Sequence, residues 1–446
     1  MNTPIVDFVR SYADKNALRL HMPGHKGTDF LGIEAFDITE IEGADVLYNS
    51  DGIIKQSENN ASTLFGTAKT LYSTEGSSLS IRAMLSLIKI YGNTKNKKAF
   101  IAAGRNAHKT FITAAALLDF EVDWLTPDSD KNMVSCNITP HFLENYLNLV
   151  AEKPLAVYVT SPDYLGNMLH IADLSKICKK YGILLLVDNA HGAYLKFLPQ
   201  NLHPIALGAD MCCDSAHKTL PVLTGGAYLH ISKTAPQMFI NSAEAAMSLF
   251  ASTSPSYLIM QSLDMANKYM ADGYKERLKA YIAETADLKS VLKSCGYMLC
   301  GDEPLKLTIA PKSYGYTGKE LSDILAEKGI ICEFADPDFT VMMLNEVIGK
   351  DDLIFLKNIL LNIPKREEIT VFPPELINGK KICSLKEAVF ALSEEIPVDE
   401  SLGRVSATTT VNCPPAIPIV LCGEEITENA IKCFKYYGIK TCSVIK

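Results

Sequence analysis

The sequence predicts an α/β protein whose main domain is a doubly wound, mostly parallel sheet. Between about residues 60 and 235, short apolar runs alternate with segments of helical periodicity, an order typical of this class. The run 183–188 has almost no polar alternation, as expected of a parallel strand covered on both faces. The expected strands are 98–103, 155–160 and 183–188. The expected helices cover 171–181 and a segment that places Ile81, Met84, Leu85 and Ile88 on one face.

The pattern of helical and strand-like segments changes after about residue 270. A long helical pattern over 271–294 precedes short strand-like runs at 305–310 and 340–344, which together predict a second, smaller α/β domain. From Val371 the chain is richer in proline. The expected parts are an N-terminal arm at 1–30, a large domain at 31–270, a small α/β domain at 271–370 and a C-terminal segment at 371–446.

Composition limits the classes of function. The 446 residues contain 43 Lys and Arg against 51 Asp and Glu, and the formal net charge is −8. Nucleic-acid binding as the main function is disfavoured, because phosphate contacts need clustered Lys and Arg. No stretch approaches about 18 apolar residues, so we expect no membrane span. The first twenty residues lack a signal peptide's apolar core, and the twelve cysteines form no C-x-x-C pair, which predicts a reducing, cytoplasmic setting.

Lys218 follows the apolar run 209–213, at a point where a core strand is expected to end. Ligands of doubly wound sheets bind beyond the carboxyl ends of the strands. An apolar setting penalises the ammonium form of a lysine and makes its amine a competent nucleophile, which is the chemistry of a Schiff base. The alternative is an ordinary exposed lysine in a loop.

Asp188 ends the apolar strand 183–188, where a buried charge is costly unless it meets a cation. A protonated pyridine nitrogen would be such a cation, and the acid would keep the ring an electron sink. His191, three residues further on, could orient Asp188. The alternative is a strand-end aspartate that caps the next turn.

Two further segments are candidates for the site. Gly76 and Ser77 lie in a hydroxyl-rich stretch just before a helical pattern, where free N–H groups and the helix dipole favour a phosphate, although any well-capped helix looks similar. Neither a Walker lysine nor G-x-G-x-x-G is present, which disfavours nucleotide cofactors. His108 could stack on a planar ring or transfer protons, or it could be a structural histidine.

In this order and spacing, these residues resemble the Orn/Lys/Arg decarboxylase family, pyridoxal-phosphate enzymes of fold type I. The similarity runs from about residue 18 to the end of the chain. The matching stretches are His21 to Gly27 (HMPGHKG), Arg105 to Lys109 (RNAHK), Thr160 to Pro162 (TSP), Val187 to Gly192 (VDNAHG), Gly208 to Asp210 (GAD), Ser215 to Pro221 (SAHKTLP), Ser252 to Tyr257 (STSPSY), Gly403 to Ser406 (GRVS) and Pro414 to Pro418 (PPAIP).

The resemblance implies a role for each matching residue. Lys218 would form the internal aldimine with pyridoxal 5′-phosphate, Asp188 would pair with the pyridinium nitrogen, and His108 would stack on the ring. His191 would belong to the cofactor site. The phosphate would be held by Gly76, Ser77, Ser215 and His217. Ser252 and Thr253 would reach the phosphate of the neighbouring subunit, which implies a homodimer or a higher homo-oligomer with a shared active site.

Three short segments depart from the family pattern. The family usually shows D-E-A-H where this chain has Asp188-Asn189-Ala190-His191, Y-P-P-G where it has Cys413 to Ala416, and N-G-T-S against Thr74 to Ser77. We expect no N-terminal wing domain like that of the large bacterial inducible enzymes, so the sequence resembles the short form.

The implied activity is decarboxylation of lysine, ornithine or arginine. The basic side chain of the substrate needs an acidic partner, for which Asp45, Asp51 and Glu424 are candidates and solvated surface carboxylates the alternative. An aminotransferase would use an arginine such as Arg366 or Arg404 to bind the α-carboxylate, and the fold alone does not exclude it. A non-catalytic, cofactor-binding regulatory protein is disfavoured because both Lys218 and Asp188 are retained.

Overall fold

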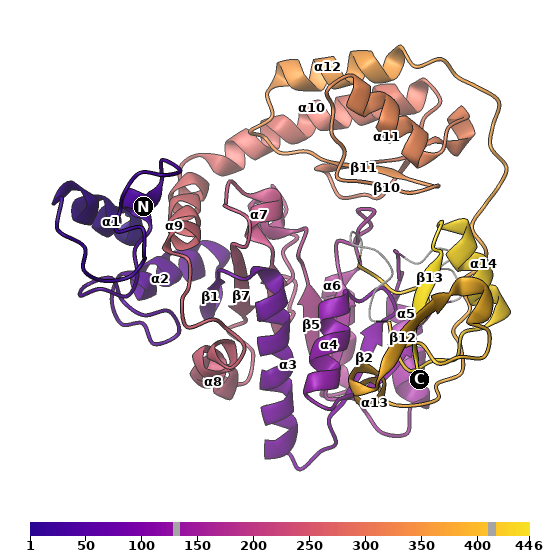
Figure 1. Cartoon of the computed structure of the whole chain (residues 1–446), viewed down its shortest axis with the longest axis horizontal. Helices are drawn as coiled ribbons and strands as arrows, with labels where there is room; N and C mark the ends of the chain where they lie inside the picture. The colour runs from indigo at the N-terminus through magenta and orange to yellow at the C-terminus, as the bar shows by residue number, and fades with distance from the viewer. Residues whose placement is uncertain (128–133, 409–415) are drawn as a thin grey trace. The chain divides into compact units, whose positions relative to one another are not determined.

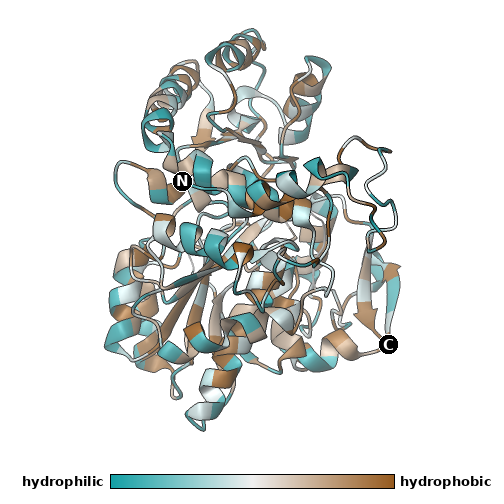
Figure 2. Cartoon of the chain, turned by 90° about the vertical axis from the view of Figure 1, so that its left-hand side faces the viewer, coloured by the Kyte–Doolittle hydropathy of each residue, from teal (hydrophilic) through white to brown (hydrophobic). Residues whose placement is uncertain are grey.

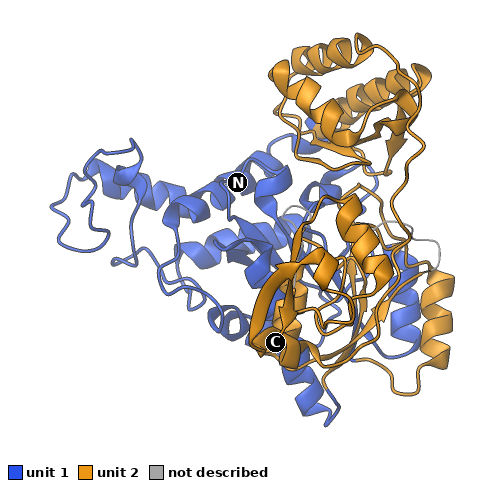
Figure 3. Ribbon diagram, turned by 45° about the vertical axis from the view of Figure 1, so that its right-hand side comes forward, with its two compact units in different colours: residues 1–98, 155–157, 171–277 blue, residues 99–154, 158–170, 278–446 orange. Residues whose placement is uncertain are grey.

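The computed structural model describes residues 1–127, 134–408 and 416–446, so Cys413, Pro414 and Pro415 of the proline-rich motif lie outside the described residues. The chain divides into two compact units (Figure 3). The first comprises 1–98, 155–157 and 171–277, and the second comprises 99–154, 158–170 and 278–446. The expected division of the chain into four consecutive parts stays a prediction.

The first unit contains the helices and strands from which the candidate site is built; Figure 1 labels the elements of the chain. They are α1 (Pro4–Asp14), η1 (Glu34–Phe36), α2 (Ile53–Phe65), β1 (Lys69–Ser73), α3 (Gly76–Thr94), α6 (Ile171–Lys180), β5 (Leu184–Asp188), η2 (Ala193–Phe197), β6 (Met211–Asp214), α7 (Ala216–Thr219), β7 (Ala227–Ile231), α8 (Gln237–Ser248) and α9 (Tyr257–Ala271).

The second unit contains the remaining elements, and β4 (Ala156–Thr160) and α10 (Tyr274–Ser294) have residues in both units. Its elements are β2 (Phe100–Gly104), α4 (Lys109–Leu117), β3 (Glu121–Leu125), α5 (Pro140–Leu149), β8 (Met298–Cys300), β9 (Lys306–Ala310), η3 (Pro311–Tyr314), α11 (Gly318–Glu327), β10 (Phe334–Ala335), β11 (Thr340–Met343), α12 (Lys350–Leu361), α13 (Leu385–Phe390), β12 (Ser393–Pro397), η4 (Val398–Glu400), α14 (Glu428–Tyr436) and β13 (Thr441–Ile445).

The large sheet confirms the predicted fold class. Its strand order is β1-β7-β6-β5-β4-β2-β3. The pairs β5–β6 and β2–β3 are parallel, whereas β7 is antiparallel to both of its neighbours, β6 and β1. The antiparallel direction of β7 was not predicted by the alternation of strands and helices. Every residue of β5 is buried, as the absence of polar alternation in its sequence requires.

The expected elements match the observed ones to within a few residues. The runs 98–103, 155–160 and 183–188 form β2, β4 and β5. The expected helix 271–294 is confirmed as α10, which begins at Tyr274. It begins later than expected because Gly273, with φ of +65°, separates it from α9. The expected strands 305–310 and 340–344 form β9 and β11 of a small antiparallel sheet ordered β10-β11-β9-β8.

The helices are amphipathic, with hydrophilic and hydrophobic residues interspersed along them (Figure 2). In α6, for example, Ile171, Leu174 and Cys178 are buried while Lys179 and Lys180 are exposed. Among the described residues, no helix is both long and apolar enough to cross a membrane. The cysteines of the described ranges are all free thiols.

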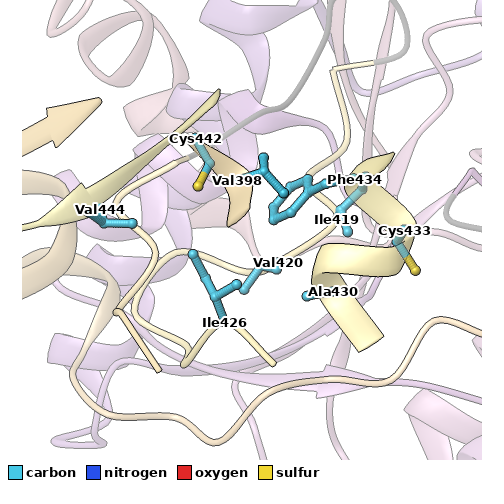
Figure 4. Close-up of a cluster of buried hydrophobic side chains, with 9 residues drawn as sticks. All are labelled: Val398, Ile419, Val420, Ile426, Ala430, Cys433, Phe434, Cys442 and Val444. Carbon is cyan, nitrogen blue, oxygen red and sulfur yellow. The ribbon is translucent and has the colours of Figure 1, made fainter. Parts of the chain in front are cut away.

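The C-terminal part of the second unit has a hydrophobic core of its own (Figure 4). β12 pairs with β13 in antiparallel fashion, and α14 and η4 contribute to the same core. The buried members are Val398, Ile419, Val420, Ile426, Ala430, Cys433, Phe434, Cys442 and Val444.

The first helix, α1, has its N-terminus bound by a distant carboxylate. Thr3 precedes the helix but gives its backbone no side-chain cap. Instead, Asp264 of α9 accepts hydrogen bonds from the N–H groups of Ile5 (3.0 Å) and Val6 (3.1 Å), and its other oxygen accepts one from Ser57 (2.5 Å). Asp264 therefore satisfies N–H groups that the helix cannot satisfy itself.

We expect Asp264→Ala to release α1. Two buried N–H donors would lose their acceptor, at a cost of about 1–3 kcal/mol in the free energy of unfolding. Hydrogen exchange of residues 4–14 should accelerate, and the urea midpoint should fall. Asp7→Ala is the control, because it removes only the hydrogen bond from Thr3 to Asp7 in the same helix. Equal effects of the two substitutions would contradict the prediction.

Candidate active site

Three strands of the first unit end at one edge of the sheet. In the parallel pair β5–β6, Asp188 lies opposite Cys213. Tyr228 of β7 pairs with Asp214 of β6 on one side and with Tyr72 of β1 on the other. The segments that follow these three strand ends are therefore brought together although they are far apart in the sequence. This is the edge at which doubly wound sheets bind ligands.

Lys218 lies at this edge, in the short helix α7 that follows β6. Its side chain is half-buried, and its Nζ lies 3.2 Å from Nε2 of His191. His191 belongs to the turn after β5 and is 5% exposed. The imidazole gives the amine a partner for the proton that it must lose to act as a nucleophile. The structure thus brings together two of the predicted site residues.

Asp188 is the last residue of β5 and is only 3% exposed. Its Oδ1 accepts hydrogen bonds from the N–H of Ala190 (3.2 Å) and the thiol of Cys213 (3.5 Å). A cationic ligand at this strand end would further offset the cost of burying the carboxylate. The position fits the predicted partner of a pyridinium nitrogen. Its expected orientation by His191 stays a prediction.

Gly76 and Ser77 begin α3, directly after the end of β1. No side chain caps this helix, and Ser215 Oγ donates a hydrogen bond to Ser77 Oγ at 2.9 Å. Gly76 has φ of +70°, and a Cβ built there would meet no atom within 4 Å. The site therefore offers two hydroxyls, an uncapped helix N-terminus and open space, which together suit a phosphate.

His217 and Ser252 have partners within the first unit. His217 Nδ1 and the carbonyl of Gly226 lie 2.9 Å apart, so its expected contact with the phosphate stays a prediction. Ser252 and Thr253 are exposed, and the N–H of Ser252 donates to Glu75 Oε1 at 2.7 Å. Glu75 directly precedes Gly76, so Ser252 lies beside the start of α3 of its own chain.

His108 lies in the second unit, after β2. It caps α4, because its Nδ1 accepts a hydrogen bond from the N–H of Thr110 at 3.2 Å. Stacking of its imidazole on a cofactor ring stays a prediction. The same loop is bound to the C-terminal segment: the Arg105 guanidinium donates to the carbonyls of Pro418 (2.9 Å) and Ile419 (2.8 Å).

The carboxylates proposed for a basic substrate are partly engaged elsewhere. Asp45 accepts hydrogen bonds from backbone N–H groups that include those of Gly52 and Ile54, at the start of α2. Glu424 accepts one from the N–H of Gly379 (3.3 Å), and burial raises its pKa while the nearby Arg105 lowers it. Asp51 is exposed.

The two arginines considered for an aminotransferase also have partners. Arg404 donates to Glu394 and to the carbonyl of Ile445, each at 2.9 Å. The Arg366 guanidinium lies 4.2 Å from the centre of the Tyr316 ring.

Two family models match the chain. The model described as "Orn/Lys/Arg decarboxylase, major domain" matches residues 3–301, and the one described as "Orn/Lys/Arg decarboxylase, C-terminal domain" matches residues 382–441. The chain belongs to the Orn/Lys/Arg decarboxylase family. It is therefore a pyridoxal-phosphate-dependent amino-acid decarboxylase of fold type I.

Relatives of this decarboxylase cover nearly its full length. The uncharacterized protein YaaO of Bacillus subtilis (strain 168) is 31% identical over 97% of this chain and 93% of its own. The arginine decarboxylase of the same organism is 28% identical over 96% and 92%. Among solved structures, the lysine decarboxylase of Francisella novicida has a TM-score of 0.79 and 17% identity, covering 100% of this chain and 81% of its own.

The residues at the sheet edge fit pyridoxal phosphate. An amine, a buried carboxylate and a pair of serines at a helix start correspond to the aldehyde, the ring nitrogen and the phosphate of the cofactor. The open space at Gly76 is of the kind that a Cβ would fill. Lys218, Asp188, Ser77 and Ser215 are the described residues whose surroundings support this fit.

Sequence reasoning missed a buried cluster beneath this site. His203, Asp214 and His230 are fully buried, and both imidazoles contact the same carboxylate oxygen. The side chain of Asn189 donates to the other oxygen of Asp214 at 2.7 Å. No sequence motif links these four residues: Asp214 lies in β6 and His230 in β7, and Asn189 and His203 lie in segments outside the strands. The one available signal was an aspartate at the end of an apolar run.

We expect Gly76→Ala to weaken cofactor binding. The alanine would occupy a left-handed conformation, at a cost of about 1–2 kcal/mol, and would place a methyl group in the space expected for the phosphate. Gly182→Ala is the control, since Gly182 has φ of +67°, no atom within 4 Å of a built Cβ, and a position in the turn before β5. Titration of the cofactor-free protein with pyridoxal phosphate should show weaker binding for Gly76→Ala alone. Similar binding by both variants would contradict the assignment.

Proposed function

We propose that the chain decarboxylates a basic amino acid and that Lys218 is the lysine that holds the cofactor covalently. The observation that carries the proposal is the contact between Lys218 Nζ and His191 Nε2, at the sheet edge where Asp188 and the Ser77–Ser215 pair also lie. When bound, pyridoxal phosphate supplies an electron sink that accepts the electron pair left at Cα as CO₂ departs.

The residues around the cofactor have separate tasks in this proposal. Asp188 keeps the ring nitrogen protonated, because its buried carboxylate favours a cationic partner. Ser77, Ser215 and the start of α3 bind the phosphate and so fix the orientation of the ring. Lys218 Nζ, with His191 Nε2 as its partner, holds the proton that Cα takes up after CO₂ leaves.

Arginine is the first substrate to test, followed by lysine and ornithine. Four relatives that align with 94% or more of this chain are arginine decarboxylases. Lysine decarboxylases among the solved structures have 16–17% identity and support the fold only. We place the enzyme in the cytoplasm, in keeping with its free thiols.

Incubation with pyridoxal phosphate and each of the three amino acids should release CO₂ and the matching amine in equal amounts from one of them. Borohydride should fix a pyridoxyl group on the peptide that spans residues 215–219. Lys218→Ala should lose at least about 10³-fold in kcat, because the amine acts in both attachment and proton transfer.

A lysine of the second unit provides the control. Lys109→Ala removes an amine from the loop of His108 and should not abolish labelling of residues 215–219. Keto-acid-dependent amine transfer without CO₂ release would overturn the decarboxylase assignment. Labelling of another lysine would overturn the role of Lys218.

We further propose that the active site is shared between two subunits of a homodimer or a higher homo-oligomer. Ser252 and Thr253 are exposed and follow α8, so their hydroxyls are accessible on the surface of one chain. In this proposal they bind the phosphate of the partner's cofactor. Cofactor affinity is then linked to dimerisation, because only the dimer contains the complete site.

Mixing Lys218→Ala with a Ser252→Ala/Thr253→Ala double variant should partly restore activity. One site of each mixed dimer would combine an intact Lys218 with an intact donor segment. Subunit exchange is measured in parallel with differently tagged chains, and a mixture of two Lys218→Ala preparations is the control. Exchange without any recovery of activity would show that each site is complete within one chain.

A further inference from the structure

The buried cluster of His203, Asp214 and His230 lies directly below the proposed site. All three side chains have no exposed surface. Nε2 of His203 lies 3.0 Å and Nε2 of His230 lies 3.1 Å from the same atom, Asp214 Oδ2. His230 is bound on its other side as well, since its Nδ1 lies 2.9 Å from Thr70 Oγ1. The carboxylate thus has two imidazole partners on one oxygen.

The second oxygen of Asp214 binds Asn189. Asn189 Nδ2 donates to Asp214 Oδ1 at 2.7 Å, and Asn189 has no exposed surface. The reverse orientation of the amide would place the carbonyl oxygen of Asn189 against the carboxylate of Asp214. The carboxylate therefore determines which amide atom is the nitrogen. Gly192 provides room for this side chain, because a Cβ at Gly192 would lie 2.0 Å from Asn189 Oδ1.

The Asn189–Asp214 hydrogen bond joins the two segments that carry the proposed catalytic groups. Asp214 precedes the Ser215–Lys218 stretch, and Asn189 follows Asp188 directly. The backbone continues the connection, as the N–H of Asn189 donates to the carbonyl of Cys213 and the N–H of Gly192 to that of Asn189. This turn presents His191, which contacts Lys218.

We propose that Asp214 is a positioning residue: His203 and His230 bind one oxygen of its carboxylate, and through Asn189 its other oxygen fixes the two strand ends that carry Asp188 and Lys218. The inference rests on the proposed function, because it concerns the placement of those two residues. Asp214 itself does not touch the cofactor in this scheme. It acts through the side chain of Asn189.

The negative charge of Asp214 explains why its partner at position 189 is an amide. Burial alone raises the pKa of Asp214, but the two histidines lower it below its ordinary value, so the carboxylate is anionic. Burial lowers the pKa of His230, so its Nε2–H donates from a neutral ring. An acid at position 189 would meet this anion at hydrogen-bond distance and would have to keep its proton.

The other titratable groups that face the cluster come from several elements. They are Cys212 and Cys213 of β6, Tyr228 of β7, Asp188 of β5 and Lys196 of η2. Burial raises the pKa of both thiols and of the phenol, so these three groups stay neutral between pH 5.5 and 8.5. A new acid at position 189 therefore adds a titration that the wild-type protein lacks.

The isosteric variant Asn189→Asp tests the pair. Its carboxyl group would have a folded-state pKa above the unfolded value, so its favourable, protonated form is lost as pH rises. Relative to the wild-type protein at the same pH, cofactor affinity should fall about tenfold at pH 8.5 and much less at pH 5.5. The urea midpoint of the cofactor-free variant should show the same pH dependence. An equal loss at both pH values would overturn the proposal.

Asn167→Asp is the matched control. Asn167 also donates through Nδ2 to an aspartate, Asp163, at 2.8 Å, but it is exposed. Its substitution should leave cofactor affinity unchanged at both pH values. The urea measurement needs no cofactor, so it still tests the Asn189–Asp214 pair if the proposed function is wrong. Failure of borohydride labelling in the wild-type protein would contradict only the proposed function.

Three further variants separate positioning from metal binding. The three ligand atoms lie within 4.8 Å of one another, which a metal ion could also use. His203→Gln keeps an N–H donor for Asp214 and should retain the absorbance spectrum of the bound cofactor, whereas His203→Leu should alter it. Asp214→Asn should weaken cofactor binding. Wild-type affinity in Asp214→Asn, or a stoichiometric metal ion that is lost in His203→Gln, would overturn the proposal.

Discussion

The antiparallel strand β7 is the constraint on which the site depends. Because β7 pairs with both β6 and β1, the strands on either side of it run in the same direction and end at the same edge. The start of α3 and the segment after β6 therefore meet, as the hydrogen bond between Ser215 and Ser77 shows. These two serines are 138 residues apart in the chain. No local preference of either segment could bring them together without this intervening strand.

The same edge concentrates buried negative charge, and each charge needs its own compensation. Asp214 is stabilised from within the fold by two histidines and an amide. The donors to Asp188 include a backbone N–H and a thiol, and the proposed function pairs this carboxylate with the ligand. The anionic Asp214 accounts for Asn189, since the acid usual in the family would face that carboxylate at this position.

The sequence was sufficient for the parts of the fold that follow from local patterns. The apolar run of β5 and the periodicity of α3 and α6 predicted buried elements correctly. A strand buried on both faces is apolar throughout, and a helix buried on one face has apolar residues at helical spacing. The family resemblance was confirmed, and the structure brings Lys218, His191, Ser77 and Ser215 into two direct contacts. The direction of β7, the capping of α1 by Asp264 and the His203–Asp214–His230 cluster were not predictable. Each depends on contacts between distant segments, and a histidine inside an apolar run carries no sign of its partner.

The loop of His108 is bound to the C-terminal segment within the second unit. Arg105 is 5% exposed, and burial lowers its pKa to about 10, so it remains a cation at neutral pH. Its guanidinium binds the carbonyls of Pro418 and Ile419, and the N–H of Lys109 donates to the carbonyl of Ala416. Ala416 has φ of +59°, a conformation that suits glycine, the usual family residue, better than alanine. The chain keeps this left-handed turn despite the side chain, because the turn directs a carbonyl at the loop that carries His108. These hydrogen bonds hold residues 416–419 of the C-terminal segment against the loop that carries His108.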